Sequence, residues 1–166
     1  MAFNEDTRVK IPALIHLTRL GYTYISLKDP NYTFDPSTNI IKNVFIDQLR
    51  KLNDGIEDNL IDQELQNIQA ELNYDDLGRA FFNRLLGKGE GELQLIDFDN
   101  FNRNVFHITT ELTNRNGEDE FRPDVTLFIN GLPLAFVEVK KPNNPEGIKA
   151  ERYRINTRFK NEKFRR

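Results

Sequence analysis

Apolar residues follow a helical period in the first half of the chain and a strand period in much of the second half. In the first half, positions such as Ile41, Phe45 and Leu49 recur at a spacing that is typical of a helix with one buried face. Glycines and asparagines separate these runs and mark where the helices stop. The segments predicted to be helical are 11–20, 41–52, 60–72 and 77–86.

The period changes from helix to strand after a glycine-rich turn at 87–91. Alternating apolar residues predict strands, and a shorter strand precedes them near the amino terminus. A last helical pattern at 147–160 follows a proline-rich break. This order predicts an α/β fold with a mostly antiparallel mixed sheet flanked by helices. The predicted strands are 22–25, 92–98, 104–111, 123–129 and 132–140, with polar connections at 29–39 and 115–120.

The last two predicted strands are joined by Asn130-Gly131, a strong turn signal. A two-residue turn would place Asp124 and Glu138 on opposite faces of the hairpin. A three-residue loop that also contains Leu132 gathers the apolar residues on one face, which we take as the core face. We therefore predict the three-residue loop, with Gly131 in the left-handed conformation. The predicted core face carries Val125, Leu127, Ile129, Pro133, Ala135 and Val137.

On the other face of this hairpin, Asp124, Glu138 and Lys140 are expected to lie together. Carboxylates that face each other about 5 Å apart at their Cα atoms repel unless a cation lies between them. Mg²⁺ binds two carboxylates and leaves positions for water and phosphate oxygens. Lys140 would then orient or deprotonate an attacking water, or neutralise the transition state. These three residues are the candidate catalytic site for hydrolysis of a phosphodiester.

A purely structural role for the same residues is the alternative. Asp124 follows Pro123 and would then only begin a strand, while Glu138 would be a solvent-facing residue paired with Lys140. Pro-Asp and Glu-x-Lys are common strings, so their spacing alone does not decide between the two interpretations. His107 lies in an alternating strand pattern, and we assign it a structural role.

Composition limits the metal chemistry open to this site. The 166 residues include no Cys and two His, which excludes a thiolate site and disfavours a zinc site. Oxygen ligands point to a hard cation, Mg²⁺ or alternatively Mn²⁺. No apolar run approaches the length of a membrane span, and the amino terminus lacks the apolar core of a signal peptide. We therefore expect a cytoplasmic protein with no membrane partner.

Charge is distributed unevenly along the chain. Residues 1–139 carry 13 basic and 23 acidic side chains, whereas residues 140–166 carry 10 basic and 3 acidic ones. A basic segment on an acidic body is typical of a phosphate-facing surface, although a solvated helix would give the same run. The predicted DNA contacts in this segment are Lys141, Lys149, Arg152, Arg154 and Arg158.

Several motifs resemble a known family of enzymes. Arg122-Pro123-Asp124, followed after 13 residues by Glu138-Val139-Lys140, resembles the PD-(D/E)xK nuclease signature. Further strings, in order along nearly the whole chain, resemble type I restriction endonuclease R subunits. These strings are Leu20-Gly21-Tyr22 and the segments 77–82, 121–134 and 136–144.

The resemblance implies a restriction-endonuclease-like fold and Mg²⁺-dependent cleavage of double-stranded DNA, the activity of a type I site-specific deoxyribonuclease. It implies that Asp124, Glu138 and the backbone carbonyl of Val139 hold the metal, and that Lys140 is the catalytic lysine. Cleavage in this family depends on ATP through a helicase-like motor, and no Gly-x-x-x-x-Gly-Lys-Ser/Thr string occurs here. The implied partners are double-stranded DNA and the modification (methyltransferase) and specificity subunits of a restriction complex.

The resemblance also sets expectations for domain organisation. We expect residues 1–166 to form a single nuclease domain, with a helical part at about 1–90 and the catalytic sheet and following helix at about 91–166. The chain is expected to be an amino-terminal fragment of a longer one that carries the motor. The rival function is a non-catalytic DNA-binding or subunit-docking module on a degenerate nuclease fold. The intact Asp124, Glu138 and Lys140 argue against this rival.

Two elements that related nucleases often carry have no clear counterpart in this sequence. A Gln-x-x-x-Tyr element is expected on the helix after the lysine, but residues 150–158 contain no Gln. Arg152, Tyr153 and Arg154 are the candidates to replace it. An acidic residue on an early helix is also expected, and its candidates are Glu71, Asp75 and Asp76.

Overall fold

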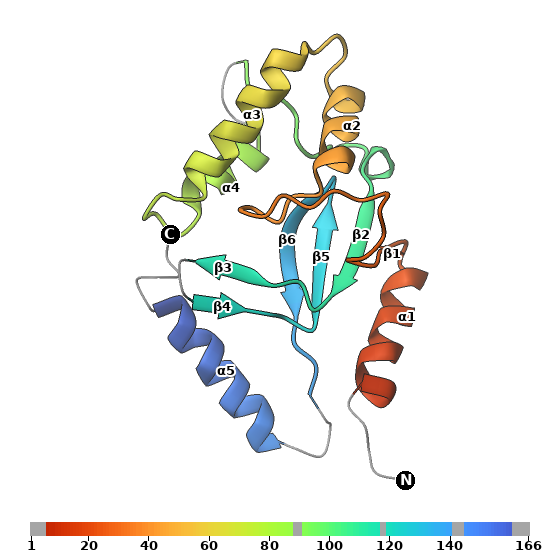
Figure 1. The fold of residues 1–166 in the computed structure, drawn as a ribbon, viewed down its shortest axis with the longest axis vertical. Helices are drawn as coiled ribbons and strands as arrows, with labels where there is room; N and C mark the ends of the chain where they lie inside the picture. Colours follow the sequence, from red (N-terminus) through yellow and green to blue (C-terminus); the bar gives the residue numbers. More distant parts are fainter. Residues whose placement is uncertain (1–5, 88–90, 117–118, 141–144, 161–166) are drawn as a thin grey trace. The chain divides into compact units, whose positions relative to one another are not determined.

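A computed structural model describes residues 6–87, 91–116, 119–140 and 145–160. The helices and strands are labelled in Figure 1. The described residues form two compact units, each built from several stretches of the chain. The first unit takes its described residues from 1–29, 106–128 and 134–164, and the second takes them from 30–105 and 129–133. The predicted division near residue 90 stays a prediction.

A four-stranded sheet is formed, in spatial order, by β1 (Thr23–Tyr24), β2 (Phe106–Thr110), β5 (Val125–Ile129) and β6 (Leu132–Val137). β1 runs parallel to β2. β2 and β5 are antiparallel, because the N–H of Glu111 donates to Asp124 at one end and the N–H of Asn130 donates to Val105 at the other. The sheet is therefore mixed, which confirms the predicted α/β class.

All five predicted helices are confirmed. The end of α4 agrees with its predicted stop at Gly87, which has a φ of 56°. Its start is held by Asp76, whose carboxylate accepts hydrogen bonds from the N–H groups of Gly78, Arg79 and Ala80. The first unit contains α1 (Ile11–Arg19), after a short π-helix at Asp6–Lys10, and α5 (Pro145–Lys160). The second contains α2 (Lys42–Leu52), α3 (Asp58–Glu71) and α4 (Arg79–Leu85).

An ion triad joins α4 to α3 in the second unit. Arg84 donates to both carboxylate oxygens of Glu64 at 3.1 Å and to those of Glu71 at 2.6 and 2.7 Å. Burial raises the pKa of Glu64, and the charge of Arg84 opposes that rise. Breaking one partner would leave a buried charge without compensation, so the triad fixes how these two helices meet.

The predicted strand at 92–98 is wrong, because this segment is irregular. Asparagine side chains bind its backbone in place of a neighbouring strand. Asn53 accepts from the N–H of Gln94 and donates to its carbonyl. Asn104 does the same for Asp97. With these backbone groups satisfied by side chains, the segment stays buried without joining a sheet.

The polar connection predicted at 115–120 is also wrong, since it forms a separate antiparallel ribbon. Its strands are β3 (Asn114–Asn116) and β4 (Asp119–Phe121). Arg115 lies directly opposite Glu120, and their side chains form an ion pair of 2.7 Å. Cross-strand pairs of opposite charge stabilise a ribbon without any apolar face, so hydrophobic alternation does not reveal it.

The loop between β5 and β6 contains two residues, not the three that were predicted. Asn130 and Gly131 both have positive φ, 52° and 83°, as a two-residue turn that matches strand twist requires. The Asn130 side chain is buried, accepts from the N–H of Val105 and donates to Leu95 and Asn104. These hydrogen bonds stabilise the left-handed conformation of Asn130. A pattern of apolar and polar positions does not reveal them, so it could not predict the two-residue turn.

The predicted core face is only partly correct. Val125 and Phe128 point to opposite sides of β5, yet both are 0% exposed. β5 is an interior strand buried on both faces, so alternation along it does not single out one core face. On β6, at the edge of the sheet, Ala135 and Val137 of the predicted core face are exposed.

Replacing Gly131 by alanine is expected to lower the free energy of unfolding by about 3 kcal/mol or more. A Cβ atom there would lie 2.8 Å from the Ile41 carbonyl oxygen and 2.9 Å from the Phe45 nitrogen. Gly55 is the matched control, because it has a φ of 75° and no atom within 4 Å of a built Cβ. Gly55→Ala should cost about 1–2 kcal/mol in urea unfolding. Equal losses in the two variants would contradict the close approach.

Candidate active site

The predicted catalytic residues belong to the first unit and flank the strands of one hairpin. Asp124 directly precedes β5, whereas Glu138, Val139 and Lys140 directly follow β6. The carboxylate Oδ2 of Asp124 accepts a hydrogen bond of 2.9 Å from the N–H of Val139. This bond closes the open end of the hairpin and holds the segment after β6 against Asp124.

Asp124 and Glu138 are brought together by a different route from the one predicted. A regular ladder continued from a two-residue turn would keep their side chains on opposite faces. However, β6 ends at Val137, and residues 138–140 have no regular secondary structure. The alternation of faces is thereby broken, and the Glu138 carboxyl comes close enough to Asp124 for their charges to interact.

Glu138 is the least exposed of the three candidate catalytic residues. Its side chain is 9% exposed, against 24% for Asp124 and 28% for Lys140. Burial raises its pKa most, followed by repulsion from Asp124 and Glu151, while Lys140 acts in the opposite direction. Among the described residues, none donates a hydrogen bond to its buried Oε1 atom. Such an oxygen is stabilised by a proton or by a cation.

Lys140 lies between two carboxylates. Its Nζ atom is 3.7 Å from Glu138 Oε2 and 3.3 Å from Glu151 Oε2. The side chain is 28% exposed, so it reaches solvent while it keeps both partners. It also lines a pocket of about 530 Å³ between β6 and α5. The other lining residues are Phe136, Val137, Glu138, Ile148, Glu151, Arg152, Ile155 and Asn156.

One cation and two acids at this site, Lys10, Glu111 and Glu151, were missed from the sequence, whereas Arg154 was predicted as a DNA contact. Lys10 lies 3.5 Å from Asp124 Oδ1 and 2.7 Å from Glu111. No local signal connects these residues, because they are about a hundred positions apart in the chain. Glu151 and Arg154 are the other pair, on α5. Glu151 did carry a signal, since it occupies the helical stripe of Ile148 and Ile155.

The predicted DNA contacts differ in how available they are. Lys149 pairs with Glu146 in an exposed pair, and Arg154 pairs with Glu151. Arg158 lies over the ring of Phe121, 4.3 Å from its centroid. Arg152 is exposed and makes no ion pair with any residue that the structure describes. Lys141 lies outside the described residues.

The remaining candidates take up structural positions. Glu71 pairs with Arg84, and Asp76 caps α4, while Asp75 is exposed. Tyr153 is 74% exposed. His107 is buried in β2, and burial lowers its pKa, which is consistent with the structural role assigned to it. Ile148 on α5 is 54% exposed and lines the pocket.

The fit of a metal rests on few donors. Within 6–87, 91–116, 119–140 and 145–160, no group of three His, Cys, Asp or Glu side chains is arranged to hold an ion. The predicted ligands need only two carboxylates and the Val139 carbonyl. The unsatisfied Oε1 of Glu138 and its repulsion from Asp124 fit a cation at this position.

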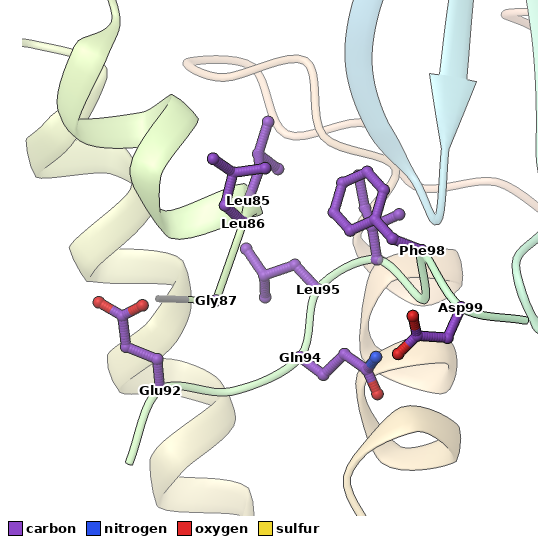
Figure 2. A pocket seen from close by; sticks show the side chains of 9 residues that line it. Leu85, Leu86, Gly87, Glu92, Gln94, Leu95, Phe98 and Asp99 are labelled. Atoms are coloured by element: carbon purple, nitrogen blue, oxygen red, sulfur yellow. The ribbon is translucent and has the colours of Figure 1, made fainter. Parts of the chain in front are cut away.

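The second unit has a pocket of its own, of about 420 Å³. Figure 2 shows Leu85, Leu86 and Leu95 on its wall, with Glu92 and Asp99 beside it. Its described lining includes no lysine, arginine or histidine. This pocket therefore has no cation paired with acids in its described lining, unlike the pocket that Lys140 lines in the first unit.

In the part of the chain that the structure describes, no helix is long and apolar enough to cross a membrane.

Comparison with known proteins identifies a family model over nearly the whole chain and relatives over most of it. The family model described as type I restriction enzyme R protein N terminus matches residues 2–166. The MjaIXP type I restriction enzyme endonuclease subunit of Methanocaldococcus jannaschii is 32% identical over 88% of this chain and 16% of its own length. The SauMSSORF170P endonuclease subunit of Staphylococcus aureus is 27% identical over 85% of this chain and 15% of its own length. No solved structure matches.

Glu138→Gln is expected to change how stability depends on pH in the presence of a chelator. Because the pKa of Glu138 is raised in the folded state, the folded protein holds that proton more tightly than the unfolded chain does. The wild type should therefore lose stability relative to the variant as pH rises through the folded pKa. Urea unfolding from about pH 4 to about pH 8 measures this difference. Parallel stability curves would contradict the raised pKa.

Proposed function

This chain belongs to the type I restriction enzyme R protein N-terminus family, and from that premise we propose that it is a metal-dependent DNA-cleaving domain with a PD-(D/E)xK active site. The observation that carries the proposal is the meeting of Asp124, Glu138 and Lys140 at one end of a hairpin. A structural role for Glu138 does not account for burying its carboxyl beside another acid, which costs stability.

Asp124, Glu138 and the Val139 carbonyl are the proposed ligands of Mg²⁺, with Mn²⁺ as a substitute. When bound, the divalent cation supplies positive charge that stabilises the charge developing on the phosphate and activates water. The Asp124–Val139 hydrogen bond holds the ligand-bearing segment in place. The oxygen donors and the unsatisfied Oε1 of Glu138 suit a hard cation.

Lys140 is the proposed catalytic lysine. Held between Glu138 and Glu151, Lys140 is part of the lining of the pocket, where a phosphate is proposed to bind. A fixed ammonium neutralises charge that develops on the phosphate oxygens in the transition state. It also donates hydrogen bonds that orient the attacking water.

The whole enzyme is proposed to be larger than this chain. The chain spans 16% of the M. jannaschii relative and 15% of the S. aureus relative. We propose that a helicase-like motor elsewhere in the subunit couples ATP hydrolysis to cleavage of double-stranded DNA. Modification and specificity subunits are the proposed partners, and recognition of a DNA sequence is assigned to the latter.

Asp124→Ala and Lys140→Ala are each expected to lower DNA cleavage by about 10²-fold or more, because each removes a group that interacts with the metal or the transition state. The measurement is Mg²⁺- and ATP-dependent cleavage of double-stranded DNA by the assembled full-length enzyme. ATP hydrolysis should stay unchanged, since the motor is intact.

Asp58→Ala provides the matched control for the aspartate, because Asp58 is exposed and its ion pair among the described residues is with the surface residue Arg50. It should cleave at the wild-type rate. Wild-type cleavage in both Asp124→Ala and Lys140→Ala would favour the non-catalytic docking module instead.

Arg152→Ala is expected to weaken DNA binding by the full-length subunit and to reduce the salt dependence of binding by about one phosphate contact. Arg152 is exposed and makes no ion pair with any described residue, so its charge is available to a phosphate. Binding isotherms at several salt concentrations measure the slope. Arg50→Ala serves as the control, because Arg50 is exposed but already paired with Asp58. An unchanged slope for Arg152→Ala would remove it from the DNA interface.

A further inference from the structure

Four side chains after β6 and on α5 form a closed ring of alternating charge. Glu138 contacts Lys140 at 3.7 Å, and Lys140 contacts Glu151 at 3.3 Å. Glu151 accepts a hydrogen bond of 2.8 Å from Nε of Arg154. Arg154 closes the ring on Glu138 at 4.0 Å. The ring therefore connects the segment after β6 to α5, which Figure 1 shows as a separate helix.

Burial distinguishes Glu151 from an ordinary surface acid of the same helix. Its side chain is 10% exposed, whereas that of Glu146, one and a half turns earlier, is 80% exposed. Surface ion pairs contribute little to stability, and a buried carboxylate costs free energy unless it is paired. Glu151 uses both of its oxygens, Oε2 on Lys140 and Oε1 on Arg154.

A bound metal would make the two acidic partners of Lys140 in this ring unequal. Glu138 is shared between Lys140 and the proposed ion, so part of its charge is engaged elsewhere when an ion binds. Glu151 is the shorter contact of Lys140, and it is not one of the proposed ligands. Glu151 is thus the partner that keeps the ammonium in position throughout.

We propose that Glu151 is a positioning residue for Lys140, anchored in turn by Arg154. This inference rests on the proposed function, because it assigns to Glu151 the task of holding the proposed catalytic lysine. Glu151 acts through Lys140 and contacts neither the metal nor the phosphate. Removing its charge should therefore slow the reaction while it leaves binding of metal and DNA intact.

The test compares Glu151→Gln with Glu146→Gln in the assembled full-length enzyme. Glu151→Gln is expected to lower the rate of cleavage at saturating DNA and Mg²⁺ by about 10–100-fold, as loss of an orienting group does. The concentrations of DNA and Mg²⁺ that give half the maximal rate should stay within about twofold of wild type. Glu146→Gln removes a carboxylate from the same helix and should behave as wild type.

A second pair of variants separates positioning from folding. Glu151→Asp keeps the negative charge and should recover part of the rate that Glu151→Gln loses. The double variant Lys140→Ala, Glu151→Gln should cleave no more slowly than Lys140→Ala alone, because both changes remove one function. If Glu151 served only to fold α5, Glu151→Asp would cleave no faster than Glu151→Gln, and that result would overturn the positioning role.

The outcomes distinguish this inference from the proposed function. If Lys140→Ala cleaves like wild type, the proposed function fails and the inference fails with it. If Lys140→Ala is inactive but Glu151→Gln cleaves like wild type, only the inference is overturned. A rise of more than about tenfold in the Mg²⁺ requirement of Glu151→Gln would also overturn it, because Glu151 would then act as a ligand.

Discussion

The site depends on one hydrogen bond, from the N–H of Val139 to the carboxylate of Asp124. It forms where the chain after β6 leaves regular secondary structure. Without it, nothing in the hairpin pattern would keep Glu138 beside Asp124, since a regular ladder places them on opposite faces. Val139 is the residue directly before Lys140, so the same contact anchors the backbone next to the lysine. A local backbone bond thus makes the proposed chemistry possible.

The sequence was sufficient for the helices and for three residues of the candidate site, Asp124, Glu138 and Lys140. Helical periodicity reports a buried stripe, and it placed α2 and α3 near their observed ends because both bury one face. The spacing of Asp124, Glu138 and Lys140, together with the family resemblance, selected three residues that do lie together. The route was wrong, however. Two wrong predictions cancelled each other. The loop was predicted one residue too long, and the last strand was predicted to continue to Lys140, whereas residues 138–140 are irregular.

The errors share a physical cause, which is the use of side chains as hydrogen-bonding partners of the backbone. Asn130, Asn53 and Asn104 bind backbone groups at distances in sequence of up to 41 residues. Such bonds replace a strand at 92–98 and stabilise the left-handed turn. Patterns of apolar and polar residues contain no information about them, because a buried asparagine looks like any polar residue in a loop.

Charge balance explains why distant residues converge on this hairpin. Asp124, Glu138 and Glu151 gather negative charge in a partly buried place, where repulsion is stronger than in water. Lys10 neutralises the Asp124 side and Lys140 the Glu138 side, while Arg154 compensates Glu151. Of these three acids, Glu138 is the one with a buried oxygen for which none of the described residues provides a donor. The three cations therefore pair with the acids of the cluster but leave Oε1 of Glu138 without a partner among the described residues, and Glu138 is one of the proposed metal ligands. A buried oxygen without a donor costs free energy, and a cation bound by the proposed ligands would supply the contact that Glu138 lacks.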